Sequence, residues 1–472
     1  MTKKTLLTNF SALTALQVVH YLVPLIVLPY LVRVIGPEKF GIVSFAQAIA
    51  YYFALIPDMG TGLYAPREIA LIKSDRDSLA RFVTGILSIK CIALLLSLAA
   101  YALLIHAVPQ FRAEIWVFVF SAGFIVGEGF IPVWFFQGIE KMVNITIGVF
   151  IIRVLALALI LTFIRSPGDY IYVPLINSGA LIFGTLLLWL LVFFREGVQL
   201  MGAGAGAMKK MVRESIPLFV SNTASNLNAG INIIVMGFLA SDLVLGYYAA
   251  AERLVKVGMG LLTQVSTVFY PHISRLVNDS RETGVAAMKK GFVAGMLLSI
   301  PATVFVVSYA EVIAAVVLGT AFPGSVAPLR ILGALFLVTG LATILGVQVL
   351  LPLGKRQRYM RPVIIGFVCQ FVLAFLLIPP FGETGAALAY VLGQTVVVFL
   401  IIRAVRKLSL GGILRSAEAR LASLAAGLGA FSLASRAMAL DSLVSIGAFC
   451  LLYVALVVML RIIDVRDWSI AA

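Results

Sequence analysis

Fourteen apolar stretches of roughly 20 residues follow one another along the chain. A helix needs about this length to cross a bilayer, where only helices and closed barrels satisfy every backbone polar group. With 61% hydrophobic residues, 12% charged residues and a mean hydropathy of +1.07, the sequence predicts an all-α polytopic membrane protein. The predicted spans are residues 8–35, 41–61, 82–106, 114–137, 142–165, 170–194, 216–240, 245–272, 291–310, 325–352, 362–379, 384–402, 412–435 and 443–463.

The distribution of Lys and Arg between the loops predicts the orientation. With a cytoplasmic N-terminus, 26 of the 36 Lys and Arg residues lie in cytoplasmic segments, six lie on the opposite side and four lie inside spans. Short cytoplasmic loops are enriched in positive charge, so we expect both termini in the cytoplasm. Topology alone then explains the net charge of +15, and we expect no nucleic-acid partner.

A weak internal repeat predicts two related halves. A shift of 205 residues places Gly41 on Gly246, Ala46 on Ala251 and Pro66 on Pro271, at equivalent places in the second helix of each half. We expect two six-helix lobes in a parallel pseudo-twofold repeat, plus two C-terminal helices. The predicted divisions are residues 1–195 for the N-lobe, 196–213 for a flexible Gly/Ala-rich cytoplasmic linker, 214–408 for the C-lobe and 409–472 for the last two helices.

Charged residues inside the spans are the main functional signal. Charge at membrane depth is costly, and it usually faces a bundle interior or a water-filled pathway. In the eighth span, Glu252 and Lys256 lie four residues apart and can pair along one helix face, whereas Arg253 points about 100° away from Glu252. This helix is therefore predicted to line a cationic cavity.

Further buried cations extend the predicted cavity. Lys90 lies about two turns into the third span, and Arg153 lies near the middle of the fifth. The predicted anion-binding set is Lys90, Arg153, Arg253 and Lys256. The alternative is interhelical pairing, for example of Arg153 with Glu128, or an extended Lys90 side chain that reaches the membrane interface.

Two further sets of polar residues are candidates for gating and for sugar contact. The candidates for ion coupling or gating are His20, Asp58, Arg67, Glu128 and Glu252, although Asp58 is better explained as a helix cap or as an ion partner of Arg67. The seventh span carries an amide stripe within an arc of about 160°, predicted to bind sugar hydroxyls or else to join helices. Its main members are Asn222, Asn226, Asn228 and Asn232.

The sequence shows no motif for catalysis. The Gly-Ala string at residues 202–206 lacks a preceding soluble strand and a following Lys-Ser/Thr, and the outer loops are too short for a catalytic domain. Cys91, Cys369 and Cys450 each fall within an apolar span and indicate no disulfide framework or metal site. We expect no enzyme activity, no cofactor and no metal, with a proton or sodium gradient as a candidate energy source.

Several motifs resemble the polysaccharide transporter family, the Wzx-type flippases. They are the run from Asn9 to Phe53, which contains Arg33-Val-Ile-Gly36-Pro37, and then Asp58-Met-Gly60, Ala65-Pro-Arg67-Glu68-Ile-Ala70, Pro132-Val-Trp134-Phe-Phe-Gln137-Gly138-Ile-Glu140, Gly246-Tyr247 through Arg253, and Pro271-His-Ile-Ser274. The resemblance covers the chain and is strongest over the first 140 residues. It places the chain in the superfamily of multidrug, oligosaccharidyl-lipid and polysaccharide exporters.

The resemblance implies a flippase of the bacterial inner membrane. Its expected substrate is an undecaprenyl-diphosphate-linked oligosaccharide repeat unit, moved from the cytoplasmic to the periplasmic leaflet for surface polysaccharide such as O-antigen. Membrane lipids are expected partners, and a polysaccharide polymerase and a chain-length regulator are candidate protein partners. The alternatives are a multidrug or cation antiporter of the same superfamily, which favours acidic lumen residues, and a peptidoglycan lipid-precursor flippase.

Overall fold

The computed structural model describes residues 3–460 apart from 227–229, 409, 415–417 and 439–441. At some further positions, including residues 3–22, it describes the backbone alone. The elements are α1 (Lys3–Asp58), α2 (Thr61–Ile72), α3 (Arg76–Ala107), α4 (Pro109–Ala113), α5 (Ile115–Phe130), α6 (Val133–Gly138), α7 (Met142–Phe163), η1 (Pro167–Ile171), α8 (Tyr172–Leu190), η2 (Leu191–Arg195), α9 (Ala205–Asn226), α10 (Ile231–Leu239), α11 (Asp242–Asp279), α12 (Arg281–Ile313), η3 (Ala314–Leu318), η4 (Pro323–Ser325), α13 (Val326–Leu332), α14 (Leu335–Thr343), η5 (Ile344–Leu350), α15 (Arg356–Arg406), α16 (Gly411–Leu414), α17 (Glu418–Ala437) and α18 (Ser442–Met459).

Each of the fourteen predicted spans falls mainly on helix where the structure describes it, although some are interrupted, for example at Met59-Gly60 and at Ile131-Pro132. Two pairs of spans lie within single long elements, α1 and α15, which are broken at Gly36 (φ 74°) and Gly382 (φ 52°). Both glycines adopt the left-handed region, which is costly for residues with a side chain. In the described part of the chain, eight helices are long and apolar enough to cross a membrane. The predicted all-α polytopic fold is confirmed.

The chain divides into two compact units, Met1–Gly246 and Tyr247–Ala472. The first unit contains α1 to α10 and the first residues of α11. It therefore extends past the predicted N-lobe, which ends at residue 195, and includes α9 and α10. The four-part division of the chain stays a prediction.

The segment predicted as a flexible linker is more ordered than its composition suggests. Helix α9 already begins at Ala205, and Val198 and Met211 are buried in a core of the first unit. The Met201 backbone N–H also donates to the Thr84 hydroxyl of α3 (3.0 Å). Two apolar side chains at suitable spacing anchor a segment that glycine and alanine alone would leave loose.

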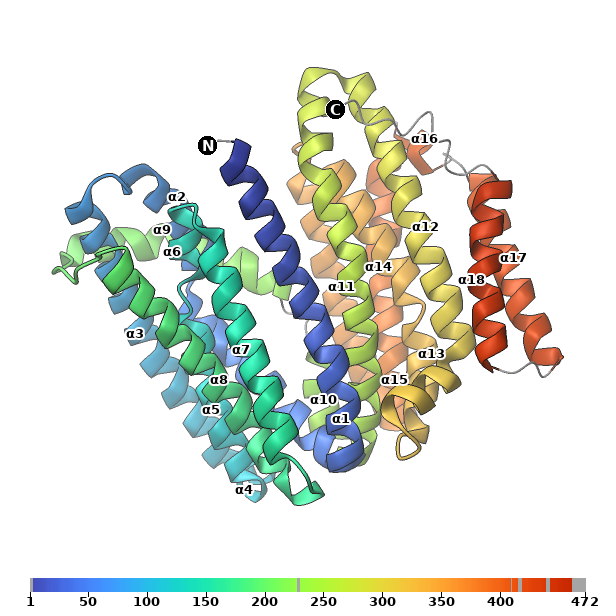
Figure 1. Cartoon of the computed structure of the whole chain (residues 1–472), viewed down its shortest axis with the longest axis horizontal. Coiled ribbons are helices and arrows are strands. Elements are labelled where there is room, and N and C mark those ends of the chain that lie inside the picture. Colours follow the sequence, from blue (N-terminus) through green and yellow to red (C-terminus); the bar gives the residue numbers. More distant parts are fainter. Residues whose placement is uncertain (1–2, 227–229, 409, 415–417, 439–441, 461–472) are drawn as a thin grey trace. The chain divides into compact units, whose positions relative to one another are not determined.

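In the first unit, α5 packs against α1 and α8 (Figure 1). Gly123 and Gly127 of α5 face Ser178 and Leu181 of α8. Ser178, Thr185 and Trp189 of α8 donate to carbonyl groups along α5 at 2.9, 3.1 and 2.8 Å. Apolar contact is a weak driving force between helices in lipid, so close packing and such hydrogen bonds specify which helices associate. The α5–α8 pair is therefore a fixed part of this unit.

In the second unit, the last two helices attach to α12. The Tyr309 hydroxyl of α12 lies 2.7 Å from the Ser445 hydroxyl of α18, and Tyr453 of α18 donates to the carbonyl of Leu297 (3.0 Å). Helix α17 also packs on α12, and α12 in turn packs on α14. The two C-terminal helices predicted beyond the lobes thus share a core with the rest of the unit.

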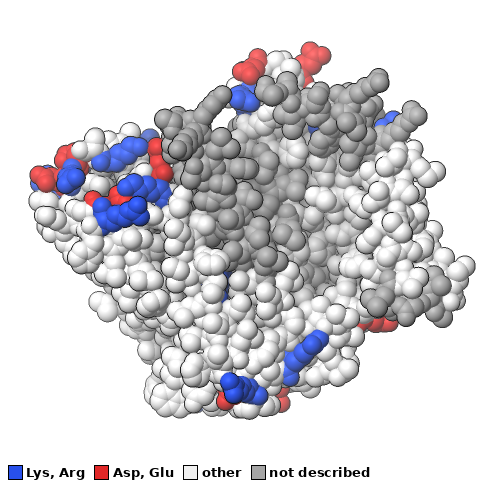
Figure 2. Space-filling model, in the orientation of Figure 1, with Lys and Arg blue, Asp and Glu red and all other residues white. Residues whose placement is uncertain are grey.

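The charged surface of the first unit is consistent with membrane insertion. Figure 2 shows most of its visible Lys, Arg, Asp and Glu side chains gathered at the end that carries α2 and α9 and at the opposite end, with a mostly uncharged surface between them that carries one small basic patch. Many large apolar side chains of this uncharged surface are exposed, among them Leu95, Leu103 and Phe163. Lipid tails accommodate such a belt, whereas water does not. The protein is a multi-pass membrane protein.

Gly184 tests the packing of α7 on α8. A Cβ at Gly184 would overlap the Ile152 side chain, and one at Gly148 would lie within 2.7–2.8 Å of Leu188. We expect Gly184→Val to destabilise the protein by about 1–3 kcal/mol through overpacking, measured as a lower Tm in detergent. Gly179→Val on the same helix is the control, because a Cβ there meets nothing within 4 Å. Equal Tm values for the two variants would contradict this packing.

Candidate functional site

Helix α1 ends in an elbow at the end of its second predicted span, residues 41–61. Met59 (φ 45°) and Gly60 (φ 75°) turn the chain in the left-handed region before α2 begins at Thr61. The Asp58 carboxylate accepts a hydrogen bond from the Gly62 backbone N–H (3.1 Å). Asp58 therefore caps the first turn of α2, where unpaired N–H groups and the helix dipole favour a negative charge.

Lys90 of α3 connects this elbow to the end of α5. Its Nζ lies 3.7 Å from the Asp58 carboxylate, donates to the Gly129 carbonyl (3.0 Å) and is 3.5 Å from the Pro57 carbonyl. An ammonium group has three N–H donors, and these contacts match them one for one. The Lys90 side chain is only 2% exposed, so its charge is paired inside the protein.

Side chains from α8 complete the end of α5. Thr185 donates to the Gly127 carbonyl and Trp189 to the Phe130 carbonyl, beside the Gly129 carbonyl that Lys90 binds. The last four carbonyls of a helix have no partner within that helix, and in a membrane they must find one elsewhere. These donors therefore stabilise a helix that stops at Ile131-Pro132, before the end of its predicted membrane span.

These contacts show where Lys90, Asp58 and Arg67 lie, while their roles in transport stay predictions. The Lys90 ammonium is engaged by Asp58 and two carbonyls, which does not support either direct substrate contact or an extended side chain at the interface. Asp58 is a cap and an ion partner as expected, but its partner is Lys90 rather than Arg67, which is exposed further along α2. The sequence could not show that α3 brings a lysine to this elbow.

Glu128 and Arg153 form a second charged pair in the first unit. Glu128 on α5 is exposed, Arg153 on α7 is partly exposed, and each lies within electrostatic range of the other. The described residues place no carboxylate in ion-pair contact with Arg153. Tyr51 of α1 also lies within electrostatic range of Glu128, a neighbour that sequence periodicity did not indicate.

In the second unit, Lys256 pairs with Glu252 as predicted. Their charged atoms are 3.1 Å apart, and the Tyr248 hydroxyl donates to the same carboxylate (3.2 Å). The Glu252 side chain is 4% exposed and that of Lys256 is 36% exposed, so the acid is buried and the ammonium reaches the surface of the unit. Tyr390 of α15 also lies within electrostatic range of Glu252. Tyr248 could have been found from its four-residue spacing to Glu252, but Tyr390 could not.

The remaining predicted residues are only partly described. Arg253 is partly exposed and has interaction partners of its own, and Asn232 is 1% exposed. A buried Asn232 fits the reading in which amides join helices better than direct sugar contact. The side chains of His20, Asn222 and Asn226, and all of Asn228, lie outside the described residues, and their roles stay predictions.

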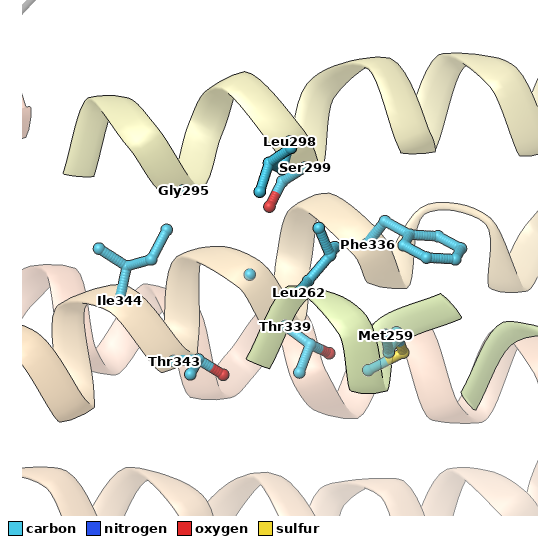
Figure 3. Close-up of a pocket in the computed structure, with 10 residues that line it drawn as sticks. Met259, Leu262, Gly295, Leu298, Ser299, Phe336, Thr339, Thr343 and Ile344 are labelled. Carbon is cyan, nitrogen blue, oxygen red and sulfur yellow. The ribbon is translucent and has the colours of Figure 1, made fainter. Parts of the chain in front are cut away.

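A small cavity in the second unit is not a substrate site. It lies between α11, α12 and α14, and Figure 3 shows Ser299, Thr339 and Thr343 among its otherwise apolar lining. Its volume is about 20 Å³, whereas pockets for small organic ligands hold about 300–1,000 Å³. None of the predicted charged residues lines it.

A family comparison matches the largest part of this architecture. A family model described as polysaccharide biosynthesis protein matches residues 6–277, more than half of the chain. The chain belongs to this family. The matched range includes Lys90, Glu128, Arg153 and the charged part of α11. The predicted family resemblance is thus confirmed.

Relatives of this family member have been named in bacteria. It is 26% identical over 407 residues to a putative O-antigen transporter of Escherichia coli K12, which covers 86% of this chain and 97% of the relative. It is 22% identical over 395 residues to the capsular polysaccharide biosynthesis protein CapF of Staphylococcus aureus, with 82% and 96% covered.

Solved structures show the shared fold. The lipid II flippase MurJ in an inward closed conformation matches with a TM-score of 0.73 at 12% identity, covering 96% of this chain and 99% of that one. An inward-facing multidrug resistance MATE family transporter matches with a TM-score of 0.63 at 13% identity, with 86% and 99% covered. This family member therefore has the fold of the superfamily that the sequence indicated.

Lys90→Met tests the elbow pairing. Removing the ammonium leaves two carbonyls without this donor and the Asp58 carboxylate without its cation. We therefore expect the free energy of unfolding to fall by about 2–3 kcal/mol, less than the full cost of a broken buried pair because Asp58 is 28% exposed. Thermal unfolding in detergent measures it, with Asp58→Asn and the double variant completing a mutant cycle.

The control for that cycle is a surface pair of the same unit. The charged atoms of Lys73 and Glu140 lie 3.2 Å apart, but their side chains are 41% and 42% exposed. Lys73→Met should therefore lower the free energy of unfolding by well under about 1 kcal/mol. Additive effects of Lys90→Met and Asp58→Asn would show that the two groups do not interact.

Proposed function

We propose that this protein is a flippase that moves undecaprenyl-diphosphate-linked oligosaccharide repeat units from the cytoplasmic to the periplasmic leaflet. Membership of the polysaccharide biosynthesis family supports it, as do relatives named O-antigen transporters and a fold shared with a lipid II flippase. Transport without catalysis fits the same relatives. The substrate passes through as cargo, and its sugars are not altered.

Arg153 is the observation that carries the proposal. It lies near the middle of α7, is partly exposed, and has a carboxylate within electrostatic range but not in ion-pair contact among the described residues. A guanidinium binds phosphate oxygens through two parallel hydrogen bonds, which suits the diphosphate of the proposed substrate. A charge at this depth is too costly to face lipid without function.

The second unit adds its own cations to the proposed path. Lys256 and Arg253 lie on α11, and the ammonium of Lys256 is 36% exposed while its partner Glu252 is buried. The pair keeps Glu252 neutralised and presents positive charge at the surface. In the proposed cycle of alternating access, the charged head group crosses past these cations while the lipid tail stays in the bilayer.

The proposal includes energy coupling and location. Glu128 is the best candidate for a proton-binding group, because it is exposed beside Arg153, whereas Asp58 and Glu252 are each held by a lysine. Protonation of Glu128 would leave Arg153 to the substrate, and its ionisation would compete for Arg153 and favour release. The proposed location is the bacterial inner membrane, with both termini cytoplasmic and with a polymerase and a chain-length regulator as protein partners.

A deletion strain tests the function directly. Without this protein, we expect lipid-linked repeat units to accumulate in the cytoplasmic leaflet and surface polysaccharide to disappear, because the donor sugars cannot reach the outer side. The wild-type gene should reverse both effects. Normal surface polysaccharide in a strain with no second flippase would contradict the proposal, and new drug sensitivity would favour an antiporter.

Arg153→Gln tests the diphosphate site in the same strain. Loss of a charge-assisted hydrogen bond costs about 1.5–3 kcal/mol, so we expect transport to fall about tenfold to a hundredfold with normal insertion. Arg153→Lys should retain part of the activity. The control is Arg76→Gln, an exposed arginine at the start of α3, which should leave transport unchanged.

Lys256 is tested in a variant that also lacks the Glu252 carboxylate, because Lys256 neutralises this buried acid. Lys256→Ala alone leaves Glu252 buried without its cation, so lost transport would not separate binding from folding. In a Glu252→Gln background, we expect Arg253→Ala/Lys256→Ala to reduce transport about tenfold while Tm stays that of Glu252→Gln. Full transport by that triple variant would remove α11 from the proposed anion path.

A further inference from the structure

Two chain segments that start equivalent helices of the predicted repeat meet inside the first unit. Helix α1 resumes after its break at Gly36, and α11 begins at Asp242. In the predicted topology both points lie on the extracytoplasmic side. The α1 segment belongs to the predicted N-lobe, and α10 and the start of α11 belong to the predicted C-lobe, so their contact crosses the predicted lobe boundary while staying within one compact unit.

The contact is made by backbone against backbone at two glycines. A Cβ at Gly41 would overlap the Asp242 carbonyl and lie 2.9 Å from the Gly246 nitrogen. A Cβ at Gly246 would overlap the Pro37 carbonyl and lie 2.6 Å from its carbon. Each glycine therefore faces the backbone of the other segment, with no space for any side chain. We call this contact the glycine seam.

The seam is reciprocal under the repeat found in the sequence. A shift of 205 residues takes Pro37 to Asp242 and Gly41 to Gly246. Gly41 thus contacts Asp242, the equivalent of Pro37, and Gly246, the equivalent of Gly41, contacts Pro37. Contacts of this form, i to j and j to i, are those that a twofold axis requires at its centre. The seam therefore lies where the predicted pseudo-twofold axis passes between the two repeats.

An aromatic layer lies next to the seam. The Phe45 ring packs edge-on against Phe238 (5.3 Å between centroids) and Phe111 (5.4 Å), and Phe111 stacks on Phe118 (4.3 Å). A Cβ at Gly237 would run into the Phe45 ring. Phe45 comes one turn after Gly41, and Phe238 belongs to α10. The layer thus closes the same lobe boundary one turn further into the membrane.

A charged cluster surrounds the seam on its outer side. Lys39 lies 3.6 Å from Glu38 and 3.9 Å from Glu114, and its Nζ is 4.9 Å from the centre of the Tyr170 ring. The Tyr170 hydroxyl donates to Glu114 (2.6 Å). Asp242, whose carbonyl forms the seam, lies within electrostatic range of Glu114, Glu38 and Lys39. Three carboxylates thus share one lysine, and we call this group the Lys39 cluster.

We propose that the glycine seam is the extracytoplasmic gate of the transport cycle, closed in this structure, and that the Lys39 cluster makes its closure favourable at acidic external pH. The proposal rests on the proposed function, since a flippase with alternating access must part its lobes at this end to release substrate. The seam is the dry, reversible contact at which they part.

The sign of the pH effect follows from Asp242. Burial, and then the Glu114 and Glu38 carboxylates, raise the pKa of Asp242, and Lys39 opposes them. A carboxyl group whose pKa is raised in the closed state favours that state when protonated. The contribution is present at low pH and is lost as the pH rises through the raised pKa. Nearby Asp169 does not share this role, because it caps its own turn through the Arg165 and Ser166 backbone N–H groups.

A cysteine reporter measures the state of the gate without measuring transport. Ala48 lies two turns beyond Gly41 and faces Gly230 at the start of α10, 3.8 Å from a Cβ built there. The experiment uses a variant in which Cys91, Cys369 and Cys450 are replaced by Ala and Ala48→Cys is the single cysteine. Right-side-out vesicles that contain this variant are treated with a maleimide that does not cross the membrane. Labelling from outside requires the seam to open.

Valine at either seam glycine should hold the gate open. We expect Gly41→Val and Gly246→Val each to raise outside labelling of Ala48→Cys about tenfold, since overpacking penalises only the closed state. Gly179→Val, where a Cβ meets nothing within 4 Å, should leave labelling unchanged. Unchanged labelling in both seam variants, inserted at normal levels, would overturn the gate.

A cross-link keeps the proposal testable where a valine variant does not fold. Phe45→Cys and Phe238→Cys, joined by a short bismaleimide, should tie the two segments together and abolish transport while the unlinked double variant stays active. Full transport by the cross-linked protein would overturn the gate. If the parent protein moves no lipid-linked oligosaccharide, the proposed function fails, whereas the labelling result still decides the gate.

The pH effect has its own comparison. Labelling of Ala48→Cys should rise as the external pH changes from mildly acidic to mildly alkaline. At each pH the value is divided by the labelling of Ala48→Cys in the Gly41→Val background, which removes the pH dependence of the thiol itself. Asp242→Asn should flatten this rise and keep labelling low, whereas Glu311→Gln, an exposed acid paired with Arg330 in the second unit, should retain it. A pH response unaffected by Asp242→Asn would remove the Lys39 cluster from gating.

Discussion

A single ammonium group binds carbonyls at the ends of two helices, α1 and α5, that stop within predicted membrane spans. In lipid, a carbonyl without a donor costs several kcal/mol, so a helix can break there only if other groups replace its lost hydrogen bonds. Lys90 does this for Pro57 of α1 and Gly129 of α5, and Asp58 balances its charge. Helices α2 and α6, which continue beyond these two breaks, pack on each other. The arrangement of this end of the first unit therefore depends on one buried cation.

The same pairing changes how the buried charges divide between structure and function. In each unit a lysine is matched with an acid, Lys90 with Asp58 and Lys256 with Glu252. The arginines are partly exposed and carry the positive charge of the proposed path, Arg153 in the first unit and Arg253 in the second. A guanidinium suits this division because it stays ionised and binds phosphate through two hydrogen bonds, whereas a lysine is readily fixed by a few carbonyls.

Much of the fold was predictable because its signals are local. Apolar spans of bilayer length, and the Gly36-Pro37 pair that separates the first two, depend on neighbours in the sequence. The Glu252–Lys256 pair follows from its four-residue spacing. The Lys90–Asp58 pair does not, because those residues are 32 positions apart and meet only through the packing of α3 on α1. The ordering of residues 198–211 was missed for a similar reason, since Val198 and Met211 are held by a core that composition does not reveal.

The choice of glycine at the repeat boundary follows from what a moving contact requires. A contact that opens in every cycle must be stable enough to exclude water and weak enough to part, which limits its strength to a few kcal/mol. A large side chain packed into a glycine notch, as Leu188 packs on Gly148, buries more area, whereas two backbones that touch through glycines gain close packing with little area. Because the glycines are equivalent in the repeat, one steric solution serves both halves. Charge around Lys39 can then adjust the balance without altering the packing.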